Sequence, residues 1–470
     1  MDSPSPFFLI RMNNAMPGNL TLETLKERVA NGQIDTVITA IPDMQGRLMG
    51  KRFHAEFFLE SAWEETHCCN YLIATDLEMY TVDGYASTSW SAGYGDYVMK
   101  SDLATLRLLP WLEGTAMVTC DLLDHHTHAL VPHAPRSVLK QQISRLQSMG
   151  LASAVATELE FFVFRESFED MRDKGYRDMT TISPYNEDYH IFQTTKEESL
   201  MRAIRNGLQG AGVKVENTKG EADPGQAEIN VGYCGALEMA DNHCLVKNAV
   251  KEIAFLNNRA VTFLAKWSHD AAGSSSHIHQ SLVSTDGDPV FFDTNAEYGM
   301  SDTMRHYLAG LLKYASDNTY FLAPYVNSYK RFVAGTFAPT KAIWSLDNRT
   351  AGYRVVADGS RNVRVECRVG GSDLNPHLAI AAQIASGIAG IEEKLDLEKE
   401  FKGDAYQARK AREIPSTLLQ AATALKKSSM LRDAMGSDVI DHYVRCAEWE
   451  LEDFNSKVTD YEVSRGFERA

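Results

Sequence analysis

The sequence predicts an α+β protein with a small N-terminal domain and a larger C-terminal domain, in which helices back an antiparallel, half-open sheet with a polar interior. Three observations support this. The chain of 470 residues is longer than one ordinary domain. Segments such as residues 155–164 carry apolar side chains on one face and polar ones on the other, as strands of such a sheet do. Beyond Arg136, short strands of this kind alternate with long segments of helical periodicity.

The first 130 residues predict a small domain of helix and hairpins. A helix, a strand, a turn and a second strand follow one another at residues 22–29, 34–41, 43–46 and 47–53. A mixed region continues to about Leu123. Pro132 and Pro135 then interrupt the pattern, so we expect one domain over residues 20–130 and a second over 131–470.

The larger domain is predicted to contain six long helices. The segment after Pro376 is rich in Ala and Gly, which favours close packing against a sheet or a neighbouring helix. The predicted helices are residues 137–149, 198–209, 236–266, 302–316, 376–394 and 437–457.

Composition narrows the classes of partner and compartment. The formal charge of −16 argues against nucleic acid and anionic membrane as partners, because binding to either needs a basic face. Seven cysteines without a C-x-x-C spacing are typical of reduced thiols in a cytosolic protein. The apolar run at residues 7–10 is too short for a signal peptide, and no window approaches a membrane span. We therefore expect a cytoplasmic protein.

A histidine-rich tract lies just before the predicted boundary. His125, His126, His128 and His133 could be interpreted as a metal site. No cysteine or carboxylate is spaced to complete a tetrahedral set, so a solvated turn is the better interpretation.

Acidic side chains gather on predicted strands of the larger domain. Glu158 and Glu160 are two residues apart on a strand and must point to the same side. Such a pair is often simply solvated, and a glycosidase-like acid pair is conceivable, although those acids normally lie on different elements. Apolar flanks indicate a buried strand here, and buried carboxylates are seldom left unpaired. The wider set better fits two divalent ions such as Mg²⁺ or Mn²⁺. Its members are Glu158, Glu160, Glu221, Glu228, Glu366 and His277.

Histidines and arginines complete the polar face. His277 and His279 share one strand face after a Gly/Ser loop, and either a structural or a ligand role fits them. Five arginines interrupt apolar sequence, which favours anion binding because Arg makes bidentate contacts to carboxylate and phosphate. Metal ions and arginines around one phosphoryl group are the requirements of phosphoryl transfer. No Walker A or kinase glycine-rich motif is present, so a nucleotide site would be of another type. The arginines are Arg331, Arg349, Arg354, Arg364 and Arg368.

The ordered set of these motifs resembles glutamine synthetases, in particular the bacterial glutamine-synthetase-like γ-glutamyl amide ligases. The resemblance implies a small β-grasp domain followed by a large catalytic domain with a curved antiparallel sheet, the glutamine synthetase fold. The motifs, in family order, are Glu158-Leu-Glu160-Phe-Phe, Gly220-Glu221-Ala-Asp-Pro-Gly-Gln226-Ala-Glu228-Ile, Gly273-Ser-Ser-Ser-His277-Ile-His279, Asn327-Ser-Tyr-Lys-Arg331, Asp347-Asn-Arg349-Thr, Arg364-Val-Glu366-Cys-Arg368 and Asn375-Pro-His-Leu.

The resemblance also implies a role for each site residue. In the family, ATP phosphorylates the side-chain carboxylate of L-glutamate, and an amine displaces the phosphate, with two or more Mg²⁺ or Mn²⁺ ions in each site. By this resemblance one metal is bound by Glu160, Glu221 and Glu228, and the second by Glu158, His277 and Glu366. The nucleotide is bound by Glu216, His279, Ser281 and Arg364. Glutamate is bound by Gly273, Arg331, Arg368 and Tyr189, and the transferring phosphate by Arg349 and Arg354.

Three departures from the family pattern concern the acceptor. Glutamine synthetases carry Gly-(Tyr/Phe)-Glu-Ala-Pro, whose Glu takes a proton from ammonium, whereas this chain has Gly335-Thr-Phe337-Ala-Pro339. Ala272 replaces the Asn that contacts glutamate, and Asp83-Gly84 only loosely resembles the ammonium-binding loop. A phenylalanine cannot accept a proton, although a weak cation–π contact is available to it. We therefore expect an organic amine as acceptor.

Several alternatives follow from this pattern. A monoalkylamine or an aromatic amine such as aniline fits Phe337 better than a polyamine, whose second ammonium would want a carboxylate. Ordinary glutamine synthesis and γ-glutamylpolyamine synthesis are the alternatives within the family, and an inactive scaffold is the alternative outside catalysis. Inactive copies usually lose metal ligands, and none is missing here.

The resemblance implies a large assembly as well. The family forms stacked rings in which the small domain of one subunit completes the site of its neighbour, so a homododecamer of two hexameric rings is expected. Tyr406 lies where the family has an adenylylation motif, but Gly403-Asp-Ala-Tyr-Gln matches that motif poorly. The sequence leaves its modification undecided.

Overall fold

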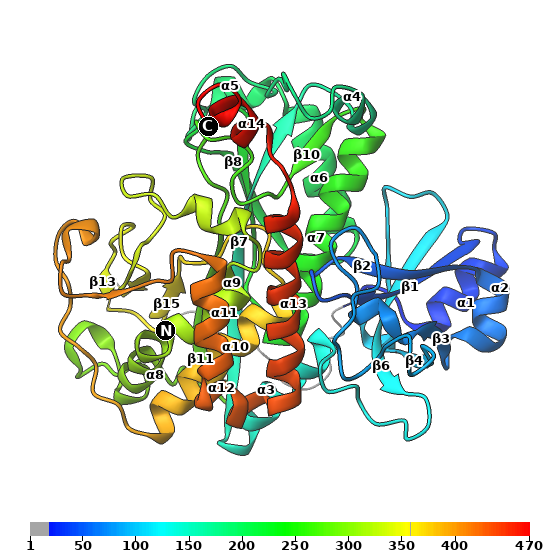
Figure 1. Cartoon of the computed structure of the whole chain (residues 1–470). Helices are drawn as coiled ribbons and strands as arrows, with labels where there is room; N and C mark the ends of the chain where they lie inside the picture. Colours follow the sequence, from blue (N-terminus) through cyan, green and yellow to red (C-terminus); the bar gives the residue numbers. More distant parts are fainter. Residues whose placement is uncertain (1–17, 358) are drawn as a thin grey trace.

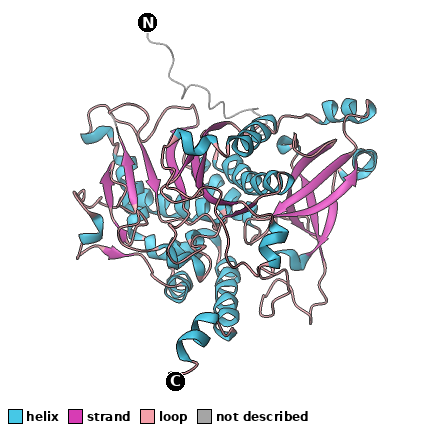
Figure 2. Cartoon of the chain, turned by 90° about the horizontal axis from the view of Figure 1, so that it is seen from above, coloured by secondary structure: helices cyan, strands magenta, loops and turns pink. Residues whose placement is uncertain are grey.

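The computed structural model describes residues 18–357 and 359–470. The apolar run at residues 7–10 lies outside the described residues. In Figure 1 a small sheet built from the first part of the chain lies beside a larger body of sheet and helices. Figure 2 separates the strands of these two parts in a second view. Among the described residues, no helix is long and apolar enough to cross a membrane.

The small sheet has six strands in the order β2-β1-β6-β4-β3, with β5 paired to β6. Helix α1, Leu22–Ala30, begins at Thr21, whose side chain forms a capping box with Thr24. The predicted hairpin is present, since β1 and β2 pair antiparallel, whereas β1 and β6 pair parallel. The strands are β1 Thr36–Pro42, β2 Leu48–His54, β3 Thr66–Cys69, β4 Asp96–Ser101, β5 Arg107–Leu108 and β6 Thr115–Asp124, with the short helix α2 Ala55–Phe57.

The large sheet has eight strands in the order β13-β14-β15-β11-β7-β9-β8, with β10 paired to β7. All its pairings are antiparallel except that of β13 with β14, which agrees with the predicted antiparallel sheet apart from this edge. The strands are β7 Leu151–Phe164, β8 Val215–Gly220, β9 Gln226–Val231, β10 Ala260–Thr262, β11 Ser276–Ser284, β13 Trp344–Leu346, β14 Tyr353–Val356 and β15 Arg364–Cys367. A separate short pair joins β12 Lys341–Ala342 to β16 Arg412–Glu413.

Helices cover the apolar side of this sheet. Helix α10 is buried from Pro376 to Gly390 and packs against α8, α3 and α7. A Cβ on Gly387 would lie 1.9 Å from the Tyr307 ring, so only glycine allows α8 to approach so closely. The predicted role of the small residues in α10 is confirmed. The helices are α3 Pro135–Ser148, α4 Phe168–Asp173, α5 Ile191–Thr195, α6 Glu198–Gly210, α7 Ala236–Leu256, α8 Asp302–Lys313, α9 Ala315–Leu322, α10 Pro376–Glu392, α11 Leu418–Lys427, α12 Ser429–Met435, α13 Ser437–Ser456 and α14 Asp460–Gly466.

Two predicted helices have the wrong extent. The helix predicted over residues 236–266 ends at Leu256, Asn258 adopts a left-handed φ of 56°, and the apolar residues beyond it form β10. The segment predicted as one helix over 302–316 is divided at Tyr314, where φ is −101° and ψ is 16°. Both errors arise because apolar side chains continue past the break, and their pattern does not record a change in backbone direction.

Buried polar contacts join the small sheet to the helices. Arg136 is 2% exposed, and its guanidinium forms ion pairs with Asp102, Asp121 and Asp241. The Asn375 side chain, at the N-terminus of α10, donates to the carbonyl of Asp43 at 2.9 Å. This hydrogen bond attaches the β1–β2 turn of the small sheet to α10. The boundary near residue 130 stays a prediction, since these contacts do not test it. All seven cysteines are free thiols, as expected.

Candidate active site

Strand register gathers the acidic side chains on the polar face of the large sheet. Glu158 of β7 lies opposite His277 of β11, and Glu160 lies opposite Glu228 of β9. Glu366 of β15 lies opposite His279. Since side chains alternate along a strand, Glu158 and Glu160 both point to the polar face, as predicted.

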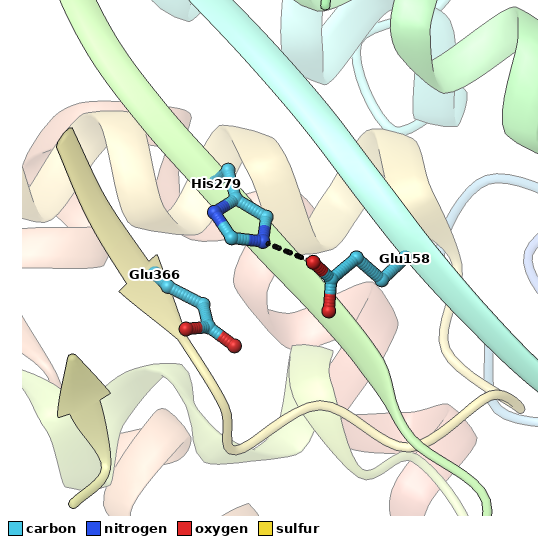
Figure 3. A group of neighbouring side chains, drawn as sticks. All are labelled: Glu158, His279 and Glu366. Atoms are coloured by element: carbon cyan, nitrogen blue, oxygen red, sulfur yellow. Dashed lines mark hydrogen bonds and ion pairs between the residues drawn. The ribbon is translucent and has the colours of Figure 1, made fainter. Parts of the chain in front are cut away.

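The first cluster consists of Glu158, His277, His279 and Glu366. Figure 3 shows Glu158, His279 and Glu366 pointing toward one another, with one ligand atom of each within 4.8 Å of the others. His277 Nδ1 lies 3.0 Å from a Glu158 oxygen and 3.4 Å from a Glu366 oxygen. The resemblance divided the two histidines between metal and nucleotide, whereas the geometry places both beside Glu158. Their individual roles remain predictions.

The first cluster is electrostatically compensated. Glu366 is fully buried, and burial alone would raise its pKa, but His277 and Arg368 outweigh this and lower the pKa to about 2. Arg354 adds a second cation at 2.9 Å from Glu366. Burial of Glu158 is likewise outweighed by hydrogen bonds from His277 and His279, and its pKa is held well below the usual range. The carboxylates of this cluster are therefore ionised at neutral pH.

The second cluster consists of Glu160, Glu221 and Glu228, with one oxygen of each within 4.8 Å of the others. Burial, reinforced by the negative charges of Glu158, Glu160 and Glu221, raises the pKa of Glu228 to about 9. Burial and Glu221 raise the pKa of Glu160 as well. Like charges this close oppose one another's ionisation.

A lysine partly offsets this repulsion. The Lys219 ammonium forms an ion pair with Glu221, lies 3.9 Å from Glu228, and lies over the Tyr189 ring, 4.7 Å from its centroid. Lys219 was not predicted from the sequence. Its position two residues before Glu221 is the one feature that could have indicated a contact with the acidic cluster. With one ammonium among them, the three carboxyl groups cannot all ionise unless a further cation binds, and hard oxygen ligands suit Mg²⁺ or Mn²⁺. The donor set thus fits a divalent cation.

A cavity of about 440 Å³ opens next to the first cluster. All four residues predicted to contact nucleotide line it, and Glu158 lines it too, so the cavity reaches the acidic face. Its volume lies within the range of ordinary small-molecule sites. Tyr233 and Asn362 are lining residues that the sequence reasoning did not select. The four predicted residues are Glu216, His279, Ser281 and Arg364.

Arg331 lies within electrostatic reach of Glu160 in the second cluster. Arg331 is 3% exposed, and its guanidinium donates to the carbonyls of Val369 and Arg368 at 2.8 and 3.0 Å. Burial lowers the Arg331 pKa to about 10, which leaves it charged at neutral pH. A Cβ on Gly273 would lie 2.5 Å from the Arg331 side chain, so Gly273 lets the two motifs meet.

The two predicted phosphate-binding arginines differ in their surroundings. Arg354 pairs with Asp347 and with Glu366, which fixes its side chain at the first cluster. Arg349 is exposed, and its carbonyl accepts from Arg368 Nε at 3.2 Å. The structure therefore brings Arg354 to the acidic clusters through side-chain contacts, and Arg349 through its backbone.

Two of the residues predicted to meet the substrates, Tyr189 and Phe337, lie on exposed loops. Tyr189 is 70% exposed and Phe337 is 57% exposed, and both adopt left-handed φ values, 56° and 57°. The Ala272 N–H donates to Asp223 at 2.7 Å, so this position contributes backbone alone. The Asp83 carbonyl accepts from Arg445 of α13 at 2.8 Å.

The first three histidines of the tract, at residues 125–128, lie in an exposed turn, as favoured above, whereas His133 does not. The backbone N–H groups of His126 and Thr127 donate to Asp124 at 3.1 and 2.8 Å. Within the described part of the chain, the groups with metal-ligand geometry are the two acidic ones, and neither includes this tract. His133 is buried, which lowers its pKa to about 4, and its ring lies 4.3 Å from that of His442.

Comparison with known proteins agrees with this geometry. Residues 132–466 match the family model "Glutamine synthetase, catalytic domain". The γ-glutamylethanolamide synthetase of Streptomyces coelicolor is 47% identical over 451 residues, 96% of this chain and 96% of that protein. The glutamate–isopropylamine ligase of a Pseudomonas species is 33% identical over 444 residues, 94% of this chain and 96% of that protein. A solved structure of a GmaS/ADP complex superposes with a TM-score of 0.82 at 24% identity, over 94% of this chain and 99% of that one, which confirms the predicted fold.

Proposed function

The chain belongs to the glutamine synthetase family, and we propose that it joins the γ-carboxylate of L-glutamate to a short organic amine. Family membership makes it an ATP-dependent carbon–nitrogen ligase. The proposal concerns the acceptor, and it rests on Phe337 in the position that the resemblance assigns to the ammonium-deprotonating glutamate.

Phe337 favours an amine over ammonia for a chemical reason. Ammonium and alkylammonium ions must both lose a proton before they can attack an acyl phosphate, and a phenyl ring neither accepts that proton nor holds either ion by charge, so the preference rests on what else the acceptor offers. An organic amine is the stronger nucleophile and brings apolar surface that a half-exposed phenyl ring can cover. The substitution thus weakens the site for ammonia and improves it for an alkylamine.

The similar proteins favour a short aliphatic amine over aniline or a polyamine. The name of one contains ethanolamide and that of the other isopropylamine, and the corresponding free amines have two or three carbons. We therefore propose ethanolamine or a short monoalkylamine as the acceptor. Ordinary glutamine synthesis is the alternative, since similar proteins such as the glutamine synthetase of Thermus thermophilus are 37% identical over 79% of this chain.

In the proposed reaction a γ-carboxylate oxygen attacks the terminal phosphorus of ATP and ADP departs. The amine, as its free base, then attacks the acyl carbon, inorganic phosphate departs, and the amine nitrogen releases one proton to solvent. Arg331 and Arg368, buried beside the second and first clusters, hold the glutamate carboxylate by charge. Arg354 and Arg349 stabilise the negative charge that accumulates during phosphoryl transfer.

The acidic clusters would hold the divalent ions. Glu160, Glu221 and Glu228 would bind one ion, and the first cluster would bind the other. Bound Mg²⁺ or Mn²⁺ would neutralise phosphate charge and orient the nucleotide. Lys219 pairs with these carboxylates and would have to move away from Glu221 when an ion binds.

The test is release of ADP from ATP, L-glutamate and Mg²⁺ with a panel of acceptors. We expect kcat/KM for ethanolamine or isopropylamine to exceed that for ammonium by about tenfold or more, because covering one or two carbon groups with the phenyl ring is worth roughly 0.8 kcal/mol each. Aniline and putrescine should rank below the short amines. A wide advantage for ammonium would refute the proposed acceptor, and absence of turnover with every amine despite bound nucleotide would favour the inactive scaffold.

We also propose the family's assembly, a homododecamer of two hexameric rings. Exposed aromatic side chains, Tyr80 and Trp90 at 72% each, lie on the loop that follows β3, where a neighbouring subunit would cover them. Analytical ultracentrifugation at micromolar concentration tests this, and a monomer would contradict it.

A further inference from the structure

Residues 403–408, between α10 and α11, connect two loops of the candidate active site. One is the phosphate-arginine loop, residues 347–354, and the other is the acceptor loop, residues 333–339, which carries Phe337. The chain continues into β16, which pairs with β12 just beyond the acceptor loop. This connecting segment is far from both loops in the sequence, yet it contacts each.

The contact with the phosphate-arginine loop is made by two side chains of that loop. Asn348 Nδ2 donates to the Gly403 carbonyl at 2.8 Å, and Thr350 Oγ1 accepts from the Ala405 N–H at 3.0 Å. Ala405 also packs in a small apolar cluster with Ala351. The connecting segment is therefore fixed relative to Arg349.

The contact with the acceptor loop is made by Tyr406. Its hydroxyl donates to the Ala338 carbonyl at 3.1 Å. Its backbone N–H donates to the Asp404 side chain at 3.0 Å, which closes a turn at the start of the connecting segment. Burial raises the Tyr406 pKa, while Arg331 and Arg368 act against this, so the hydroxyl lies within electrostatic reach of the two proposed glutamate-binding arginines.

The acceptor loop needs an external contact of this kind. Gly335 and Phe337 both adopt left-handed φ values, 85° and 57°, and for phenylalanine this conformation is strained. The Thr336 hydroxyl donates to the Val333 carbonyl at 2.7 Å, a bond inside the loop that does not attach it to neighbouring segments. Since Phe337 is half-exposed, the packing of its ring does not secure it either.

We propose that Tyr406 is a positioning residue for acceptor selection, whose hydroxyl holds the Phe337 loop beside Arg331 and Arg368. The inference rests on the proposed function and extends it, because it names a residue that acts on the acceptor through the backbone of Ala338. It also assigns Tyr406 a role other than modification, since the hydroxyl is engaged with a carbonyl in the half-buried interior of the site.

The first test is Tyr406→Phe, which removes the hydroxyl and keeps the ring. We expect KM for the amine to rise by about three- to tenfold, the usual effect of one lost hydrogen bond, with KM for glutamate and for ATP changed less than about twofold. Tyr314→Phe is the matched control, since it removes a tyrosine hydroxyl bond of 2.6 Å to Glu393 on the helical side of the molecule. A general rise in all three KM values, or an unchanged KM for the amine, would overturn the inference.

The second test asks whether Tyr406 acts through the loop. In a double-mutant cycle with Phe337→Ala, the effect of Tyr406→Phe on the ratio of amine to ammonium kcat/KM should largely disappear. Independent, multiplicative effects would show that Tyr406 does not act through Phe337.

Hydrogen exchange separates this inference from the proposed function. Peptides covering residues 333–339 should exchange faster in Tyr406→Phe than in the parent or in Tyr314→Phe, whichever acceptor is used. Faster exchange in a protein that prefers ammonium would retain the role of Tyr406 and refute the proposed acceptor. Unchanged exchange in a protein that uses the short amines would refute the role of Tyr406 and retain the proposed acceptor.

Discussion

The two acidic clusters on the large sheet share β7, where Glu158 and Glu160 are two residues apart, yet they are in opposite electrostatic states. In the first cluster, two histidines and two arginines surround Glu158 and Glu366, whose pKa values lie below their ordinary range. In the second, three carboxylates share one ammonium, and the pKa of Glu228 is raised to about 9. Side chains of the protein itself balance the charges of the first cluster, whereas the second requires an added cation before its carboxylates can all ionise.

This difference indicates that the two clusters have different roles. A cluster whose charges are balanced by its own side chains keeps its geometry before substrate arrives, which favours a role in positioning phosphate and nucleotide. A cluster with excess negative charge gains more from each cation bound. Variants in each cluster test whether the two differ in this way.

The largest expected effect is on catalysis. Glu228→Gln and Glu366→Gln should each lower kcat by about a hundredfold or more, because each removes a charge that a bound cation needs. The measurement is ADP release with glutamate and the preferred amine. Glu169→Gln, an exposed residue at the start of α4, is the control and should retain full activity. Near-normal turnover in either cluster variant would remove that cluster from the site.

The next effect concerns the phosphate-arginine loop. Arg349→Ala should lower kcat by about tenfold to a hundredfold and change KM for glutamate far less, since its charge complements the transferring phosphoryl group and not the bound substrate. Steady-state kinetics with varied glutamate decide this. A rise in KM without a fall in kcat would move Arg349 to the glutamate site.

The two clusters should also respond oppositely in stability. Without divalent cations, Glu366→Gln should lower the free energy of unfolding by about 3 kcal/mol, because it leaves Arg354 and Arg368 without a buried partner. Glu228→Gln should raise it at neutral pH, because Glu228 must take up a proton when the protein folds and glutamine need not. Denaturant titrations with EDTA measure both.

Added Mg²⁺ completes the comparison. It should raise the melting temperature of the parent by several degrees, as binding to the folded state does, and should do so less in Glu228→Gln. Equal shifts in both proteins would mean that the second cluster does not hold the ion.

The sequence was informative wherever chemistry follows from local periodicity. Glu158 and Glu160 had to share a face because they are two residues apart on one strand, and the resemblance supplied the remaining ligands. The pairing of Glu158 with His277 depends on register across more than a hundred residues of chain, which no local pattern specifies. The end of α7 was misplaced for a similar reason, since the apolar residues of β10 continue its pattern.

The roles of two residues could not be predicted from the sequence because they depend on tertiary contacts. Lys219 looks like any strand lysine until β8 lies beside β9 and brings its ammonium to Glu221 and Glu228. Tyr406 matched a family motif poorly, and its bond to Ala338 spans 68 positions in the chain. Both contacts join segments that sequence periodicity treats independently.

The smallest expected effect comes from a third acidic group, the pair Glu187 and Glu197. It tests whether two buried carboxyl groups can lie side by side in the folded protein without a cation between them. Glu187 and Glu197 are both buried next to the second cluster, and the Gly225 N–H donates to Glu187 at 3.1 Å. Burial and the charge of Glu187 raise the Glu197 pKa to about 8 from 4.5. A folded-state pKa raised above the unfolded value means that the folded state binds more protons in this window. Stability is therefore fully present below about pH 4.5 and is lost as pH rises toward 8.

Glu197→Gln keeps the size of the side chain and removes its ionisation. We expect the variant to melt a few degrees above the parent near pH 8, with the difference vanishing near pH 5, because the parent loses a shared proton over that interval and the variant does not. Melting curves from pH 5 to 9 in EDTA test this, and their repetition with Mg²⁺ separates this pair from the second cluster. The difference should be insensitive to Mg²⁺, because no cation needs to enter between Glu187 and Glu197, whereas the stability difference caused by Glu228→Gln should shrink or reverse. If Mg²⁺ abolished the difference in melting temperature between Glu197→Gln and the parent, the Glu187–Glu197 pair and the second cluster would titrate as one unit. The pair would then belong with the second cluster among the acids that depend on a cation, in contrast to the first cluster, whose charges the protein balances itself.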